Sequence, residues 1–226
     1  MSTPHNPGDS LSRRRKFLYI LTLGALTALG PFTVDLYLPA FPALEESLGV
    51  SAAAVQLTLT GTTIGFALGQ LVVGPLSDKF GRRLPLIVAT AVHIAASLGA
   101  AQSTDIATLG FFRVLMGVGA AGGGVVAMAM VRDLFSGYAM VRMFARMALV
   151  NGLAPILAPV IGSQLLLLVP WPGIFLFLAA YGTCVIIAAL FVIRETLPPE
   201  LRGKSGMTAG QRYKVLFSDR IFVGLL

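Results

Sequence analysis

The fold is decided by a short charged stretch, GPLSDKFGRRLP (residues 74–85), which lies between two long apolar runs. Residues 52–73 before it and residues 84–104 after it contain no Asp, Glu, Lys or Arg. Each run is close to the ~20 residues that an α-helix needs to cross the hydrocarbon core of a bilayer. The pattern therefore predicts two membrane helices joined by a tight, charged turn at one membrane surface.

The same pattern continues in both directions along the chain. Further apolar runs cover residues 17–34, 107–131 (interrupted by Arg113) and 147–193. The last run is long enough for two spans, and the sequence PWP at 170–172 would separate them. Strands of a membrane barrel would alternate apolar and polar residues, and these runs do not. We therefore expect an all-α integral membrane protein with six transmembrane helices.

Composition supports a membrane protein and narrows the kinds of site. Hydrophobic residues make up 56% of the 226 residues and charged residues only 12%, against about 25% charged in soluble domains. The single cysteine, Cys184, excludes an intramolecular disulfide and a multi-cysteine metal site. We expect no metal, no cofactor and no enzymatic activity.

The positive charges lie on one side of the predicted membrane. Of the 17 Lys and Arg, 16 lie in the N-terminal tail, in alternate connections or after the sixth span, and the other is Arg113. The opposite loops contain Glu45, Glu46 and Asp105 but no Lys or Arg. The positive-inside rule places the basic side in the cytoplasm, which explains the basic pI of 10.1 without nucleic-acid binding. We expect a multi-pass protein of the cell inner (cytoplasmic) membrane with a cytoplasmic N-terminus.

An N-terminal signal peptide is the alternative for the first run. Residues 13–16 are basic and the following run is apolar, as in such signals. The run is longer than a signal core, and no small-residue cleavage site follows it, so we interpret it as a retained span.

Two motifs resemble a known transporter family. Residues 74–85 resemble the signature loop of the major facilitator superfamily, which has the form G-x-L-S-D-K/R-x-G-R-R. The residues that this resemblance assigns to the loop and its gating are Gly74, Asp78, Gly81, Arg82, Arg83 and Asp133. It implies a latch between Arg82 and Asp133, with Asp78 meeting a second half of the transporter. Residues 109–117, LGFFRVLMG, resemble the fourth-helix motif of the same family, which contains a buried arginine.

Two further segments resemble drug transporters of this superfamily. GLAPILAPVIG, residues 152–162, resembles the fifth-helix motif of drug/proton antiporters. Its motif positions are Gly152, Pro155, Pro159 and Gly162, and Ala158 replaces the usual glycine before the central proline. DLYLPAFP, residues 35–42, is similar to the first-helix segment of the Bcr/CflA multidrug efflux group. The resemblance covers about residues 17–195 and implies proton-coupled efflux (drug/H+ antiport) of small lipophilic compounds across the cytoplasmic membrane.

The resemblance also implies a domain organisation. The six spans correspond to the N-terminal half of a twelve-helix fold, so we expect a missing C-terminal six-helix half as a partner, besides protons, a drug-like substrate and the lipid bilayer. The expected segments are a cytoplasmic tail (1–16), a six-helix bundle (17–193), a cytoplasmic central linker (194–219) and the start of a truncated seventh helix (220–226). The alternatives are a transporter of the same fold for a sugar or an organic acid, or a non-transporting membrane assembly fragment.

Asp35 and Arg113 are the charged residues within predicted spans. A charge in a span costs at least ~2.5 kcal/mol on insertion scales, so it is a candidate functional group. We expect Asp35 to carry the proton and Arg113 to be its partner in a hydrated cavity. Two structural alternatives remain: Asp35 as an interfacial residue beside the outer loop, and Arg113 as a hydrogen-bond hub for backbone carbonyls.

Glycines and one histidine complete the list of candidates. Gly61, Gly65 and Gly69 repeat every four residues, which predicts close approach of a neighbouring helix. GVGAAG, residues 117–122, fits a dinucleotide fingerprint by letter, but that motif requires a preceding strand. We therefore interpret these glycines as packing residues. His93 lies within a span, where a hydrogen bond to a neighbouring helix is favoured over a proton relay.

The charge pattern yields a topology that reporter fusions can test. Fusions at three acidic or apolar connections should report the exterior, namely Glu46, Asp105 and Pro170. Fusions at three basic connections should report the cytoplasm, namely Arg82, Arg142 and Lys204. A cytoplasmic signal at Glu46 would refute the orientation, because the positive-inside rule leaves the loop after the first span outside.

Overall fold

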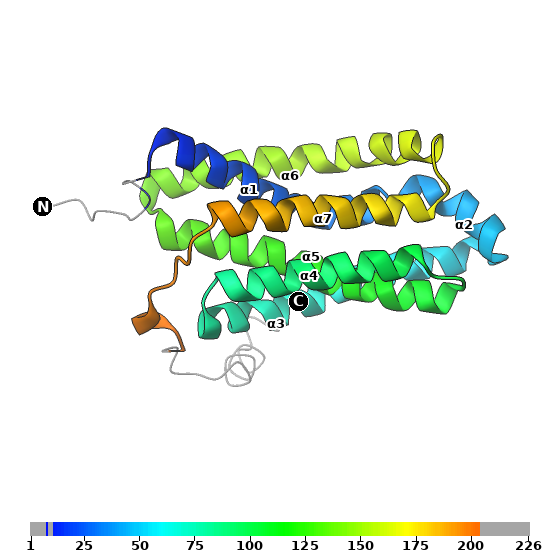
Figure 1. Cartoon of the computed structure of the whole chain (residues 1–226), viewed down its shortest axis with the longest axis horizontal. Coiled ribbons are helices and arrows are strands. Elements are labelled where there is room, and N and C mark those ends of the chain that lie inside the picture. Colours follow the sequence, from blue (N-terminus) through cyan, green and yellow to red (C-terminus); the bar gives the residue numbers. More distant parts are fainter. Residues whose placement is uncertain (1–7, 9–10, 204–226) are drawn as a thin grey trace, which may run out of the picture.

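The structure is a computed structural model that describes residues 8 and 11–203, and within them the regular structure is entirely helical (Figure 1). Six long helices lie side by side along the long axis of the molecule: α1 (Arg13–Asp35), α3 (Ala52–Phe80), α4 (Arg83–Ala101), α5 (Ile106–Leu134), α6 (Gly137–Leu166) and α7 (Pro172–Val192). Short helical segments are η2 (Leu38–Ala40), α2 (Phe41–Leu48) and η3 (Pro199–Leu201). All six long helices are apolar enough to cross a membrane. The predicted all-α fold with six spans is confirmed.

Several helices extend beyond the apolar runs that predicted them. α1 begins at Arg13, where the Ser12 hydroxyl accepts a hydrogen bond from the Arg15 amide, so the predicted tail ends four residues early. α6 begins at Gly137, ten residues before the uncharged run that starts at 147. Hydrocarbon restricts where charges lie, whereas a helix continues for as long as its backbone groups pair internally.

The predicted turn at 74–85 is mostly helix. α3 continues to Phe80 and α4 begins at Arg83, so only Gly81 and Arg82 connect them. Our expectation of a longer turn was wrong because Gly74 and Pro75 do not end α3. The helix ends at Gly81, whose φ of 93° is a conformation that favours glycine.

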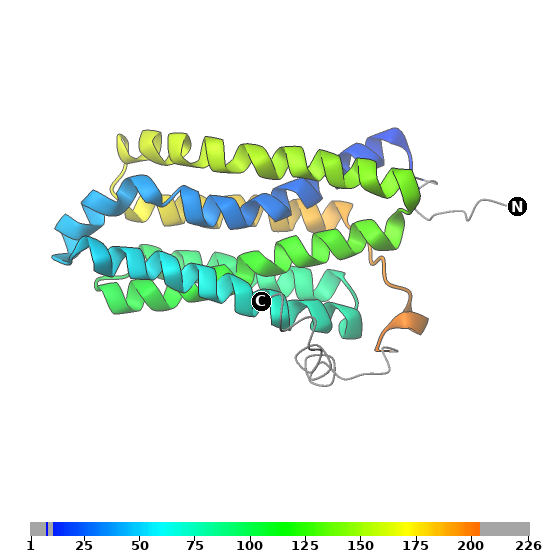
Figure 2. The same cartoon turned by 180° about the vertical axis from the view of Figure 1, so that it is seen from behind.

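The connections between the helices give the two ends of the bundle different chemical compositions. One end, here called the basic end, contains the start of α1, the α3–α4 and α5–α6 connections and the chain after α7 (Figures 1 and 2). The other end, here called the α2 end, contains α2 and the α4–α5 and α6–α7 connections. Asp105 at the α2 end caps α5, because its carboxylate accepts hydrogen bonds from the Ala107 and Thr108 amides, each 2.9 Å long. The hydrogen bonds from Thr108 lower the pKa of Asp105.

The contacts between helices join the first three long helices to the last three. α1 packs on α6, α3 on α5 and α4 on α7, and α5 also contacts α1 and α4. α1 starts at the basic end, whereas α5 starts at the α2 end, so the first three long helices and the last three run in opposite senses. This arrangement matches the inverted repeats found in transporter halves.

Glycines allow α3 and α5 to approach closely. A Cβ atom at Gly65 would collide with the Val114 carbonyl, and a Cβ at Gly117 would collide with the Thr62 carbonyl. A Cβ at Gly69 would lie 2.6 Å from the Val118 carbonyl oxygen. The predicted packing role of these glycines is confirmed, including for Gly117 in the segment that resembled a nucleotide fingerprint.

α6 is the least buried of the six helices. Only 17% of its most apolar 18-residue stretch is buried within the described residues, against 61% for the central α5. Large apolar side chains on its outer face include Leu149, Leu153, Ile156 and Val160. This face is suited to contact lipid or another apolar protein surface.

Parts of the predicted organisation lie outside the described residues. These are most of the N-terminal tail, the linker from residue 204 onward and the predicted start of a seventh helix at 220–226.

The α3–α5 contact predicts the effect of one methyl group. Gly117→Ala should lower the thermal unfolding midpoint of the purified protein by roughly 3–10 °C, because overpacking costs about 1–3 kcal/mol. Gly110→Ala is the matched control on the same helix and facing the same partner, since its Cβ would lie 3.9 Å from the Thr58 methyl carbon, an ordinary contact. Equal midpoints for the two variants would contradict the close approach.

Candidate functional site

Arg113 is a fully buried cation in the middle of the bundle. Its side chain has 0% exposure on α5. Nη1 donates a 2.7 Å hydrogen bond to the carbonyl oxygen of Thr33 on α1. The guanidinium carbon lies 4.0 Å from the ring centroid of Tyr37 and 6.0 Å from that of Phe175. A carbonyl and two aromatic faces therefore stabilise the charge without a carboxylate.

Two donors of Arg113 remain unused. Nε and Nη2 are buried and have no hydrogen-bond partner among the described residues. An unpaired buried donor is costly, and a charged one more so. These two nitrogen atoms therefore leave Arg113 incompletely satisfied within the described part of the chain.

Thr33 connects Arg113 to His93 on α4. The Thr33 hydroxyl lies 2.6 Å from the Leu29 carbonyl oxygen, to which it donates, and 2.8 Å from Nε2 of His93. A hydroxyl that donates to Leu29 accepts from His93, which assigns the proton of the neutral ring to Nε2. Nδ1 of His93 then has no partner among the described residues. The predicted hydrogen bond from His93 to a neighbouring helix is confirmed.

The expected pair between Asp35 and Arg113 is not formed. Asp35 is the last residue of α1, is partly exposed and makes no ion pair or hydrogen bond within the described part of the chain. Arg113 instead contacts Thr33, two residues earlier. Successive helix residues are about 100° apart, so residues two apart face nearly opposite sides. The structural alternative, in which Arg113 donates hydrogen bonds to backbone carbonyls, agrees with the bond from Nη1 to Thr33.

A charged network centred on Arg82 lies at the basic end. Its guanidinium contacts Asp78 on α3 at 2.5 Å and Asp133 on α5 at 2.9 Å, and Nη1 also donates to the Ser77 hydroxyl at 2.9 Å. Burial alone would lower the pKa of Arg82, but the hydrogen bonds to Asp133 and Asp78 raise it overall. The network therefore joins the end of α3 to the end of α5.

One contact of this network was implied by the sequence motif. Arg82 contacts Asp133, the residue that the family resemblance pairs with it. Asp78 also accepts a hydrogen bond from Arg82, and its expected contact with another half of the protein stays a prediction. Four residues separate them in sequence, so the sharp connection at Gly81 brings both to one side of the helix end.

Glu195 is a member of the network that sequence reasoning missed. Its Oε1 accepts from the Arg82 amide at 2.9 Å and its Oε2 from the Arg83 amide at 3.2 Å, so it caps the start of α4. Burial alone would raise the pKa of Glu195, but backbone hydrogen bonds from Leu197, Arg82 and Arg83 lower it overall. Thr196 next to it donates to Asp133 at 2.9 Å. The chain after α7 is thereby fastened to α4 and α5.

No sequence signal marked Glu195, because Arg82 is 113 residues away from it.

The remaining loop residues have lesser roles in this network. Arg83 donates to the Leu190 carbonyl of α7 at 2.8 Å. A side chain at Gly81 would meet the Glu195 carboxylate, whereas one at Gly74 would make only an ordinary contact, 3.7 Å from Val125.

The segment 152–162 lies within α6. Pro155 and Pro159 are both inside the helix. A Cβ at Gly162 would collide with the carbonyl of Leu36, the residue directly after α1, so this glycine allows α6 to approach the end of α1 beside Asp35. A Cβ at Gly152 would meet nothing within 4 Å. The segment therefore packs on α1 at one end and is open at the other.

The described residues offer no evident metal centre. No three His, Cys, Asp or Glu side chains gather within them in a way that could hold a metal ion. The interior cluster of Arg113, Thr33, Tyr37 and His93 provides instead hydrogen-bond donors and aromatic surface.

Comparison with known proteins identifies the family. The sequence model of the Major Facilitator Superfamily matches residues 13–226. An uncharacterized MFS-type transporter, YdgK of Bacillus subtilis (strain 168), is 37% identical over 223 residues, which cover 97% of this chain and 54% of the relative. The bicyclomycin resistance protein homolog of Haemophilus influenzae is 38% identical over 190 residues, or 84% of this chain and 48% of the relative. Multidrug resistance protein MdtL of Salmonella paratyphi B is 32% identical over 183 residues, or 81% and 46%.

Solved structures agree on the fold. The proton:xylose symporter XylE has a TM-score of 0.72 at 13% identity, covering 82% of this chain and 46% of that one. The human organic anion transporter MFSD10 has a TM-score of 0.64 at 22% identity, covering 86% and 51%. The chain spans about half the length of the relatives it matches. It therefore belongs to the Major Facilitator Superfamily, whose members are transporters, and it forms the six-helix N-terminal half of that fold.

Proposed function

We propose that the complete protein exports small lipophilic compounds from the cytoplasm in exchange for protons. The observation that carries this proposal is the likeness, at 32–38% identity, to relatives named as bicyclomycin resistance and multidrug resistance proteins. The α6 segment 152–162, which resembles an antiporter motif, supports it. The fold alone does not, because a xylose symporter shares it.

The substrate site that we propose lies where α1, α5 and α6 meet a second half of the transporter. Transporter halves of this kind enclose the substrate between them near the midplane. Arg113 with its two unused donors, Tyr37 and Phe175 supply polar and aromatic groups in the interior behind this surface, where all three are fully buried. The apolar outer face of α6 supplies a wall suited to lipophilic compounds.

We assign the proton to Asp35 as part of this proposal. It is the last residue of α1, next to the apolar run 17–34, and it is partly exposed, so water can reach it. It has no fixed partner in the described part of the chain, which leaves its carboxylate free to change protonation. Its nearest link to Arg113 is through the α1 backbone at Thr33 rather than by direct contact.

The orientation is also part of the proposal. The positive-inside rule supports a basic end that faces the cytoplasm, with the chain in the cell inner membrane. The Arg82 network would then hold α3, α4, α5 and the start of the linker together on the cytoplasmic side. We propose that it closes this side when the cavity faces outward and opens during transport.

Neutralising Asp35 tests proton coupling. Asp35→Asn in the complete protein should abolish uphill efflux from proteoliposomes under an imposed pH gradient, because an amide keeps the shape of the side chain but cannot titrate. Substrate binding should persist, since apolar contacts elsewhere supply it. Arg113→Ala should be as damaging, and Arg113→Lys intermediate, because the charge remains without the planar fork.

Glu46→Gln is the matched control, since Glu46 is an exposed carboxylate at the same α2 end. Normal uphill pumping by Asp35→Asn would move the proton site elsewhere. A panel of sugars, organic acids and lipophilic drugs tests the substrate class, and selective uptake of a sugar or an organic acid would overturn efflux of drugs.

Removing the Arg82–Asp133 contact tests the latch. Arg82→Ala and Asp133→Ala should each slow transport roughly tenfold or more, because a hydrogen bond to a charged group contributes about 1.5–3 kcal/mol. The double variant should be no worse than either single variant, since both remove the same interaction. Arg132→Ala removes an exposed neighbouring charge and should have little effect. Additive losses in the double variant, with normal membrane insertion, would show that the contact is not a functional unit.

A further inference from the structure

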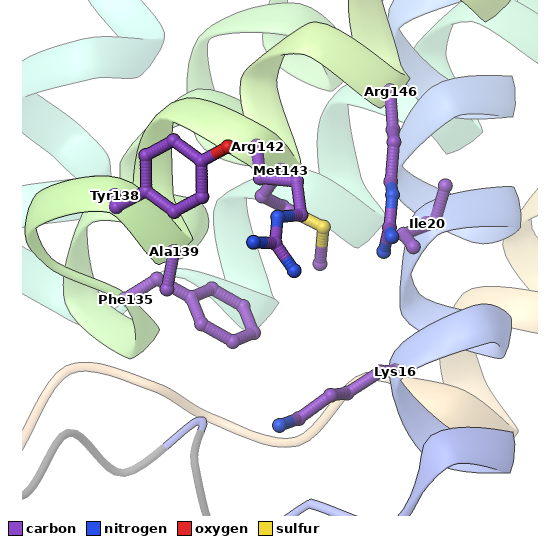
Figure 3. Close-up of a pocket in the computed structure, with 8 residues that line it drawn as sticks. All are labelled: Lys16, Ile20, Phe135, Tyr138, Ala139, Arg142, Met143 and Arg146. Carbon is purple, nitrogen blue, oxygen red and sulfur yellow. The ribbon is translucent and has the colours of Figure 1, made fainter.

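A cavity of about 180 Å³ opens at the basic end between α1 and α6 (Figure 3). Three cationic side chains line it, Lys16 from α1 and Arg142 and Arg146 from α6. Its apolar wall includes Ile20, Phe135 and Met143. The figure shows the charged ends of all three cations turned toward the open space.

Within the described residues these three charges have no carboxylate partner. The ion pairs within the described residues are Arg82–Asp78, Arg82–Asp133 and Arg202–Glu195, and none of them includes a cation of the cavity. Arg142 instead lies over the ring of Tyr138, 4.8 Å from its centroid. Like charges that share one cavity repel each other, so an anion placed among them would be stabilised by all three.

The position of the cavity relative to the membrane surface indicates which kind of anion it can bind. Lys16 is the last charge before the apolar run that starts at 17, and Arg146 is the last before the uncharged run that starts at 147. The cations therefore lie where hydrocarbon gives way to lipid headgroups. The apolar wall lies directly beside them, so a ligand must present a negative group and an apolar portion together.

We propose that this cavity binds the phosphate of an anionic phospholipid, with the base of an acyl chain against Ile20 and Met143. A phosphodiester matches the three cations, because Arg presents a planar fork of donors and Lys a compact charge. Basic pockets between membrane helices at a membrane surface are suited to such headgroups. The site does not depend on what the protein transports. It lies apart from Arg113 and Asp35, so a lipid bound there holds the start of α1 against the start of α6.

Native mass spectrometry of the complete protein in detergent tests the proposal. The probes are phosphatidylglycerol, phosphatidylcholine and inorganic phosphate. Wild type should retain phosphatidylglycerol over phosphatidylcholine. The variant K16Q/R142Q/R146Q should bind phosphatidylglycerol on the order of 100-fold more weakly, because it removes all three cations that would attract the anionic headgroup. The control R13Q/R14Q/R132Q removes the same charge from residues that do not line the cavity, and it should retain the lipid.

Two further variants test separately the charge of the three cations and the open volume of the cavity. K16R/R142K/R146K keeps the charge and should keep most of the binding. Ala139→Trp keeps all three cations but fills the cavity from α6, and should lose the lipid. Equal retention by the cavity variant and the control would overturn the site. Binding of inorganic phosphate with no preference for phosphatidylglycerol would overturn the lipid assignment in favour of a soluble anion.

Discussion

Lipid hydrocarbon cannot hydrogen-bond a peptide group, so each span must close its backbone hydrogen bonds within one helix. The same solvent removes the hydrophobic effect as a cause of helix association, since lipid tails are as apolar as the side chains. Helices then associate through close packing. α3 meets α5 through Gly65 and Gly117, where each glycine faces a carbonyl of the other helix. α5 becomes the central helix because it offers such small positions to α3, α4 and α1, including Gly119 against α4 and Gly123 against α1.

Polar side chains within the spans obey the same constraint. Threonine hydroxyls donate hydrogen bonds to carbonyls three or four residues earlier in their own helices, as Thr62 and Thr90 do. Three of the four buried side-chain nitrogen atoms that lack a partner among the described residues lie together, and the fourth is Nε of Arg83 at the basic end. Nε and Nη2 of Arg113 and Nδ1 of His93 lack partners among the described residues, and Thr33 joins these two side chains. Polar groups left unsatisfied in an apolar interior cost stability, so their concentration between α1, α4 and α5 marks the part of the bundle most suited to function.

The two ends of the bundle use charge differently. At the α2 end the carboxylate of Asp105 caps a helix. At the basic end the carboxylates of Asp78, Asp133 and Glu195 hold Arg82, the start of α4 and the chain after α7 together. The cations beside α1 and α6 stay unpaired within the described residues. Basic residues at this end thus have two roles in the structure: Arg82 joins helix ends, and Lys16, Arg142 and Arg146 line a cavity.

The sequence by itself determined the number of spans, their order and the asymmetry of charge, because these depend on local composition and on the ~20-residue thickness of hydrocarbon. It also identified Arg113 and Arg82 as special, since a charge inside a span or a charged cluster between spans is visible along the chain. It did not determine their partners. Asp35 was expected to pair with Arg113, yet the structure gives that role to the Thr33 carbonyl and the ring of Tyr37. Glu195 had no sequence signal, although it caps α4 from 113 residues away. Partners of this kind depend on which helix faces which and at what rotation, and only tertiary packing sets those two quantities.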